Sequence, residues 1–140
     1  MSTESNKAAV RRFFEQFGLA TVDDLLLPNY VHHDPGLPPQ MQNGREAYKQ
    51  VVNMFLTGLP DMRTTVEDLI AEGDKVAARW TARGTHSGNL MGIPPTGKSV
   101  TVTGTSTHRF AGGKLAESWV NFDAMGMLQQ IGAIPTPKAG

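Results

Sequence analysis

The 140-residue sequence has no cysteine, no excess of charge of either sign and no long apolar run. Without cysteine, the chain can form no disulfide, no thiolate nucleophile and no thiolate metal site. Its 13 basic and 13 acidic residues give a formal net charge of zero, so a nucleic acid or an anionic membrane would meet no basic field. No segment approaches the roughly 20 apolar residues that span a bilayer, and the polar residues 2–7 lack the apolar core of a signal peptide. We expect a soluble, cytoplasmic protein that binds neither nucleic acid nor membrane.

The composition that is present is globular. Hydrophobic residues make up 39% and charged residues 19% of the sequence, and a chain of this length can enclose a core. No internal repeat, linker or low-complexity tract divides it. The sequence therefore predicts a single domain at residues 1–140, with its core at about residues 6–132 and a flexible tail at 133–140.

The first half of the chain has helical periodicity. Apolar side chains at i, i+3, i+4 and i+7 predict a helix that Gly18 ends. These side chains are Val10, Phe13, Phe14 and Phe17. Thr21, followed by Asp24 three positions later, resembles a capping box and predicts a second, short helix that Pro28 ends. The elements expected next are an extended segment at 29–34, a proline-rich loop at 35–39 and a third helix at 44–57.

The second half of the chain is rich in Val, Thr and Trp, which are residues typical of strands. Strands are predicted at residues 64–71, 75–84, 100–110 and 114–122. Turns at 72–74 and 111–113 join them as two hairpins, with a Gly- and Pro-rich loop at 86–98 between the hairpins. A last helix at 123–130 has Asp123 as its expected N-cap. Helices first and antiparallel strands afterwards predict an α+β fold rather than a parallel α/β fold.

The last hairpin gives the main hint of a pocket. A three-residue turn at 111–113 would pair His108 with Ala116 and Ser106 with Ser118, on one face of the sheet. An imidazole and two hydroxyls on the helix-covered face must find partners or line a wet cavity. The predicted lining residues are Trp80, Ser106, His108, Ser118, Val120 and Phe122.

The opposite face of this hairpin carries Trp119 and Leu115 among four threonines. Its only charged residues are Arg109 and Glu117, whereas a fully solvated face would hold more. Threonine and tryptophan suit a half-buried pleated surface, and tryptophan is favoured at the centres of interfaces. We therefore expect a homodimer that forms through this face.

Several stretches together resemble the SnoaL-like polyketide cyclase and ester cyclase family. They are residues 30–35, 66–76, 79–86, 92–98, 113–123 and 128–132, in the order and spacing of the family. The resemblance implies a cone-shaped barrel like that of nuclear transport factor 2, with N-terminal helices packed on a curved, mostly antiparallel (mixed) sheet. It also implies a cofactor-independent enzyme that closes a polyketide ring by intramolecular aldol condensation, without a metal.

The same resemblance implies an acid/base aspartate on the last strand, but here that position is Val120. The family's pocket histidine falls at Ser106, and His32 takes a pocket position where the cyclases carry a small amide. Because a valine cannot move a proton, the resemblance predicts the fold but not the aspartate-dependent mechanism.

The histidines are the remaining candidates for proton transfer, because imidazole titrates near neutrality. His108 is either a general acid/base or a core histidine bonded to Ser106 or to the backbone. The cluster of His32, His33 and Asp34 either lines the pocket or forms a turn. His86 either closes over a ligand or caps a strand. Adjacent histidines on a strand point apart, so no metal site is expected.

Two classes of function follow. The first is an enzyme that transfers protons on a small, apolar, oxygenated ligand, such as a polyketide, ketone or ester, with His108 and His32 as catalytic residues. The second is a non-catalytic module that binds a small molecule or a partner. The substrate-binding candidates are Trp80, Ser106, Ser118, Val120, Phe122, Met54, His33 and His86.

Overall fold

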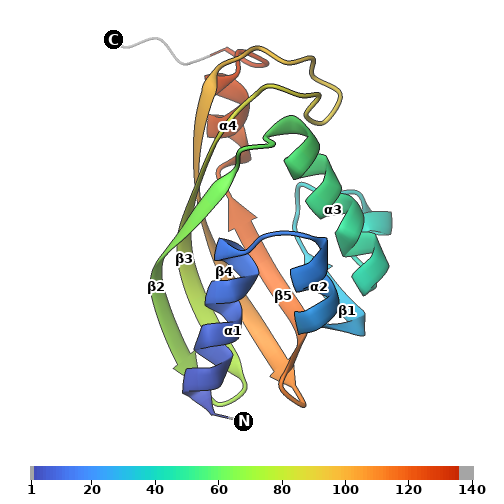
Figure 1. Cartoon of the computed structure of the whole chain (residues 1–140), viewed down its shortest axis with the longest axis vertical. Helices are drawn as coiled ribbons and strands as arrows, with labels where there is room; N and C mark the ends of the chain where they lie inside the picture. The colour runs from blue at the N-terminus through green and yellow to red at the C-terminus, as the bar shows by residue number, and fades with distance from the viewer. Residues whose placement is uncertain (1, 136–140) are drawn as a thin grey trace.

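The computed structural model describes residues 2–135 and has helices packed on one curved sheet (Figure 1). The elements in chain order are α1 (Thr3–Glu15), α2 (Leu19–Leu25), β1 (Leu26–His33), the short 3-10 helix η1 (Pro39–Met41), α3 (Arg45–Gly58), β2 (Arg63–Glu72), β3 (Lys75–Thr85), β4 (Ser99–Ala111), β5 (Lys114–Phe122) and α4 (Ala124–Gln130). Residues 136–140 of the expected flexible tail lie outside the described residues.

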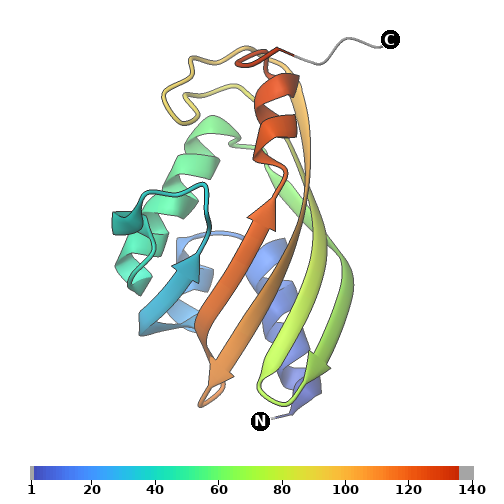
Figure 2. The same ribbon diagram turned by 180° about the vertical axis from the view of Figure 1, so that it is seen from behind.

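The sheet has the strand order β1-β5-β4-β3-β2. Strands β2 to β5 form an antiparallel meander, and β1 runs parallel to β5, so the sheet is mixed. The edges β1 and β2 do not pair with each other, so the cone stays open. Helix α1 packs on β2 and β3, α3 packs on β1, and α4 packs on β4, while the other face of the sheet is in front in Figure 2. The predicted α+β fold is confirmed.

Helix α1 forms where the apolar stripe predicts, with a capping box between Ser2 and Ser5 at its start. It ends at Glu15, so the predicted end at Gly18 is wrong and Phe17 lies beyond the helix. The capping box expected at Thr21 is wrong. Helix α2 begins at Leu19, before Thr21, and the Thr21 hydroxyl donates to the backbone oxygen of Gln16 at 2.6 Å. Pro28 lies inside the edge strand β1, where pairing with β5 is interrupted between Leu26 and Val31. A proline is tolerated there because its missing N–H removes no ladder bond.

The predicted register of the last hairpin is also wrong, by two residues. Only Gly112 and Gly113 form the turn, with φ angles of 58° and 81°, as a two-residue hairpin loop requires. His108 therefore lies opposite Ser118 instead of Ala116. An even shift leaves every side chain beyond the bulge on its predicted face.

A bulge in β5 changes the face of the sheet on which Leu115 lies. Arg109 pairs with Glu117 but the next residue, Phe110, pairs with Leu115, so Ala116 has no partner across the ladder. The extra residue turns Leu115 inward, where it is fully buried in the core. The expectation that Leu115 lies on the outer face is therefore wrong, whereas Trp119 does lie there and is 37% exposed.

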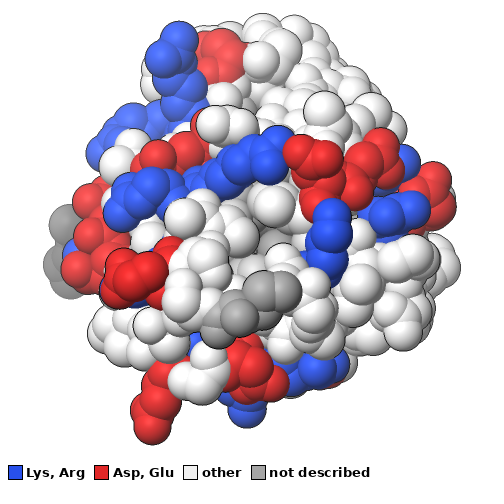
Figure 3. Space-filling view, turned by 60° about the horizontal axis from the view of Figure 1, so that its bottom comes forward, with Lys and Arg blue, Asp and Glu red and all other residues white. Residues whose placement is uncertain are grey.

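The charges on the surface match the neutral composition. On the face shown in Figure 3, Lys and Arg side chains lie among Asp and Glu side chains. Within residues 2–135, no helix has both the length and the apolar character needed to cross a membrane.

Candidate active site

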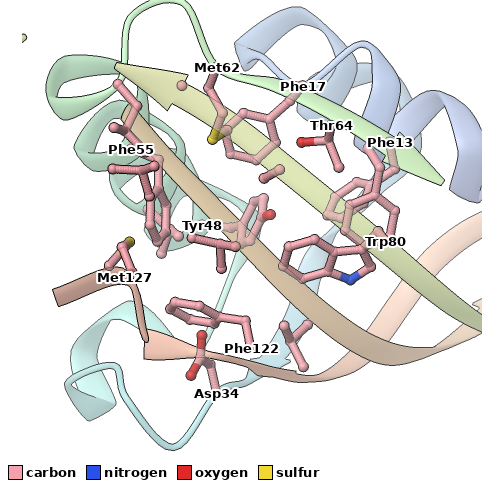
Figure 4. A pocket seen from close by; sticks show the side chains of 18 of the residues that line it. Phe13, Phe17, Asp34, Tyr48, Phe55, Met62, Thr64, Trp80, Phe122 and Met127 are labelled. Carbon is pink, nitrogen blue, oxygen red and sulfur yellow. The ribbon is translucent and has the colours of Figure 1, made fainter. Parts of the chain in front are cut away.

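An apolar cavity of about 80 Å³ lies between the helices and the concave face of the sheet (Figure 4). Aromatic rings from α1, the turn after it, α3, β3 and β5 line it. They belong to Phe13, Phe14, Phe17, Tyr48, Phe55, Trp80 and Phe122. Pockets for drug-sized ligands measure roughly 300–1,000 Å³. A ligand of that size would have to displace flexible wall residues such as Met62 and Met127.

Trp80 forms one wall of the cavity because its neighbour in the sheet is a glycine. Gly104 pairs with Trp80 across β3 and β4, and a Cβ on Gly104 would come within 2.3 Å of the indole ring. The ring of Phe14 covers the indole at 5.3 Å and 27°. The indole Nε1 has no hydrogen-bond partner among the described residues. It is therefore an unused donor beside the cavity.

The polar part of the wall comes from β1, where strand alternation puts Tyr30 and His32 on the inner face. The Tyr30 hydroxyl lies 3.0 Å from His32 Nδ1, and the ring of Tyr48 packs 4.7 Å from the imidazole. His32 is 4% exposed, and burial lowers its pKa to about 4. The imidazole is therefore neutral near pH 7, and Nε2 has no partner among the described residues.

His108 lies beneath this wall and is fully buried. Its Nε2 is 2.7 Å from the Ser106 hydroxyl, and its Nδ1 is 2.7 Å from the Ser118 hydroxyl. Burial lowers the pKa of His108 to about 3. Ser118 also lies close enough to the Tyr30 hydroxyl to lower its pKa, although burial raises that pKa by more. A buried polar chain thus runs from Ser106 through His108, Ser118 and Tyr30 to His32.

Asp34 adds a carboxyl group to the same wall. It is 6% exposed, and its Oδ1 accepts the backbone N–H of Gly36 at 2.9 Å. Burial raises the pKa of this carboxyl, and the bond from Gly36 lowers it by less. Within the described residues, no three His, Asp or Glu side chains come together in a way that would hold a metal ion.

The predicted site residues fall into three groups: those that line the cavity, those that lie beneath its wall, and those that do neither. Trp80, Val120, Phe122 and His32 line the cavity. Ser106, His108 and Ser118 are absent from its wall and lie beneath it, bonded as described above. Met54 is half-buried and packs against the core without lining the cavity.

The last two predicted residues lie away from the cavity. His33 is on the outer face, where its Nε2 is 2.6 Å from Glu117 and its ring stacks on Trp119. His86 is fully buried and holds the loop at 86–98, with Nδ1 3.0 Å from the Thr96 hydroxyl.

Sequence reasoning missed two tyrosines of the site, Tyr48 in the cavity wall and Tyr30 bonded behind His32. Tyr30 lies two positions before His32, so alternation along the strand could have placed it on the same face. Tyr48 has the helical spacing of the core residues Val51 and Val52, and nothing in that pattern separates it from them.

Comparison with known proteins identifies the family of this chain. A sequence model described as SnoaL-like polyketide cyclase matches residues 7–131. The aklanonic acid methyl ester cyclase DnrD of Streptomyces peucetius is 28% identical over 149 aligned positions, which cover 99% of this chain and 97% of DnrD.

Two solved structures have the same fold over almost the whole chain. AclR of Streptomyces galilaeus, a candidate hydroxylase, has a TM-score of 0.84 and 26% identity, covering 98% of this chain and 87% of AclR. IdmH of Streptomyces antibioticus, a candidate polyketide cyclase, has a TM-score of 0.76 and 34% identity, covering 94% and 99% of the two chains. The fold, the matched residues and these relatives together show that the chain belongs to the SnoaL-like polyketide cyclase family.

Proposed function

We propose that this protein is a cofactor-independent cyclase that moves protons on an apolar ketone or ester and closes a ring within it. One observation carries the proposal: the neutral imidazole of His32 lies in the wall of an aromatic cavity, fixed from behind by a buried polar chain. The family and the activity in the name of DnrD support ring closure as the reaction class.

In this proposal, His32 donates a hydrogen bond to a carbonyl oxygen of the ligand. If the Tyr30 hydroxyl donates to Nδ1, the proton of the neutral imidazole lies on Nε2. Nε2 then stabilises the negative charge that develops on the oxygen when a neighbouring carbon loses its proton. This donor works in a mostly apolar site, where its interaction with the charge is stronger than in water.

His108 has a positioning role in this scheme, because it does not line the cavity. The bonded groups can all donate in one direction: Ser106 to His108, His108 to Ser118, and Tyr30 to His32. The Ser118 hydroxyl lies close enough to Tyr30 to lower its pKa. Such a one-way arrangement sets the tautomer of His32 and strengthens each bond in turn. The side chains of Trp80, Val120 and Phe122 would hold the apolar part of the ligand.

Turnover of aklanonic acid methyl ester, the compound in the name of DnrD, tests the proposal. Purified protein with EDTA and no added cofactor should convert the ester to a cyclised isomer. His32→Gln should lower kcat by roughly 10²- to 10⁴-fold. The matched variant His33→Gln changes the adjacent residue on the outer face, and it should stay within a few-fold of the wild type. Absence of turnover, a requirement for metal, or equal losses in the two variants would contradict the proposal, and binding without turnover would favour a non-catalytic module.

We also propose a homodimer through the outer face of the sheet. A shallow hollow there is lined by Trp119 together with Ile70, Thr105 and Thr107, and Ile70 is 71% exposed. In sedimentation at micromolar concentration, the wild type should be a dimer and Trp119→Glu a monomer. Met125→Glu places the same charge on an exposed apolar residue of α4, and it should leave the dimer intact. A monomeric wild type, or a dimeric Trp119→Glu, would refute the proposal.

A further inference from the structure

Asp34 is the only carboxylate among the described residues that line the cavity. Its Oδ1 accepts the backbone N–H of Gly36, which is the bond that a turn at this position needs. The other oxygen, Oδ2, accepts none of the hydrogen bonds between described residues. Figure 4 shows the carboxyl group beside Phe122, within the ring of side chains that surrounds the cavity. The turn therefore explains only one of the two carboxylate oxygens.

The surroundings of Asp34 make its carboxylate a stronger base than one in water. Burial raises the pKa of the carboxyl above its ordinary value of 3.8. The titratable groups that face it are His32 on the same strand and Tyr48 from α3, whose own pKa is raised in part by this carboxylate. Neither group is positively charged at neutral pH, so neither holds the carboxylate in a weakly basic state.

The position of Asp34 relative to β5 is informative. In the parallel pairing of β1 with β5, His32 lies opposite Ser118 and His33 lies opposite Trp119. The pairing ends there, and Asp34 and Val120 are the next residues of the two segments; both line the cavity. A carboxylate is thus present in the wall that Val120 also lines, although it comes from the residue that follows β1.

We propose that Asp34 is the general base of this cavity, supplied from the residue that follows β1, whereas β5 contributes Val120 to the same cavity. The inference rests on the proposed function and names the group that removes the proton. Asp34 and His32 are two positions apart on one face of an extended chain, which separates them by roughly 7 Å. One residue can therefore act on a carbon while the other acts on the oxygen of the adjacent carbonyl group.

The proton and the electrons balance in this reaction. The Asp34 carboxylate takes a proton from the carbon next to a carbonyl group, and the C–H electron pair moves into the enolate, whose oxygen is held by His32. The enolate carbon then forms a bond to a second carbonyl carbon of the same molecule. The oxygen of that carbonyl group receives the proton from Asp34, so the enzyme ends in its starting state.

A test that does not need the natural substrate uses 5-nitrobenzisoxazole, a small planar aromatic probe. A carboxylate in an apolar pocket removes its C3 proton, the N–O bond breaks, and a coloured cyanophenolate forms. The wild type should accelerate this elimination, with a rate that rises with pH to a plateau as Asp34 ionises. Asp34→Asn keeps an oxygen for the Gly36 N–H and should lower the rate roughly 10²-fold or more. Asp68→Asn, which removes a carboxylate from the outer face, should leave the rate unchanged.

A second variant guards against a folding defect in Asp34→Asn. Asp34→Asn combined with Val120→Asp moves the carboxylate across to β5, and it should recover at least tenfold of the lost rate. An Asp34→Asn protein that keeps both the wild-type rate and the wild-type pH profile would overturn the inference. If elimination depends on Asp34 but the ester is not turned over, the base assignment stands and the proposed function fails. If the ester is turned over equally by wild type and Asp34→Asn, the inference fails alone.

Discussion

Gly104 determines how close Trp80 lies to the sheet. The indole covers this residue so closely that even a methyl group would overlap three of its ring atoms, at 2.3–2.7 Å. Phe14 lies against the indole with its ring nearly parallel, so the indole has little room to move away. A glycine in a strand otherwise rich in β-branched residues is therefore explained by this contact.

We expect Gly104→Ala to destabilise the protein by about 1–3 kcal/mol, because the displaced indole must push into the cavity or into Phe14. Urea unfolding gives the free energy, and the emission of tryptophan reports the altered environment of the ring. The control is Gly18→Ala, where the added methyl group meets nothing within 4 Å. Equal unfolding midpoints for the two variants would show that the contact is unimportant.

At the scale of elements, the sequence predicts which segments are strands and which faces they present, but it does not predict their register. Alternation correctly places His108, Ser118 and Val120 on the inner face. The turn is one residue shorter than predicted, and Ala116 forms a bulge that no local pattern reveals. Leu115 therefore lies in the core instead of on the outer face.

The residues of the candidate site are likewise only partly predictable from the sequence. The position of His32 in the pocket is predicted by resemblance to the family, and Trp80 and Phe122 by alternation. The polar chain from Ser106 to His32 is not predictable in this way, because it depends on the parallel pairing of β1 with β5. Nothing local in either strand indicates that the two are neighbours, and the resemblance points to Val120 instead of Asp34.

For the whole molecule, the lowered pKa values of His32 and His108 predict a loss of stability in mild acid. The unfolded chain binds protons at His32 and His108 below about pH 6.5, whereas the folded chain resists protonation until about pH 4 and about pH 3. The free energy of unfolding should therefore fall as the pH drops from 6.5 to 5, by about 1.4 kcal/mol per pH unit for each histidine at most. Asp34 opposes this trend, because its raised pKa favours the folded state as the pH falls.

The His108→Asn variant isolates one of the two contributions. Its absolute stability will be lower, because Ser106 and Ser118 lose their shared partner. The informative quantity is the slope of the unfolding free energy against pH, measured by urea unfolding between pH 6.5 and pH 5. That slope gives the number of protons that the chain takes up on unfolding, and this number should be smaller by about one than in the wild type. An unchanged slope would mean that His108 is protonated in the folded protein.

The pairing of β1 with β5 also has a consequence for synthesis of the chain. His33 and Glu117, which bond across these strands, are 84 positions apart. At about 5–20 residues per second, a ribosome needs roughly 4–17 s to make the intervening segment. During that time β1 has no strand to pair with, and its backbone donors and acceptors are free to pair with another nascent chain. A ligand cannot help at this stage, because Val120 and Phe122, which line the cavity, have not yet been translated.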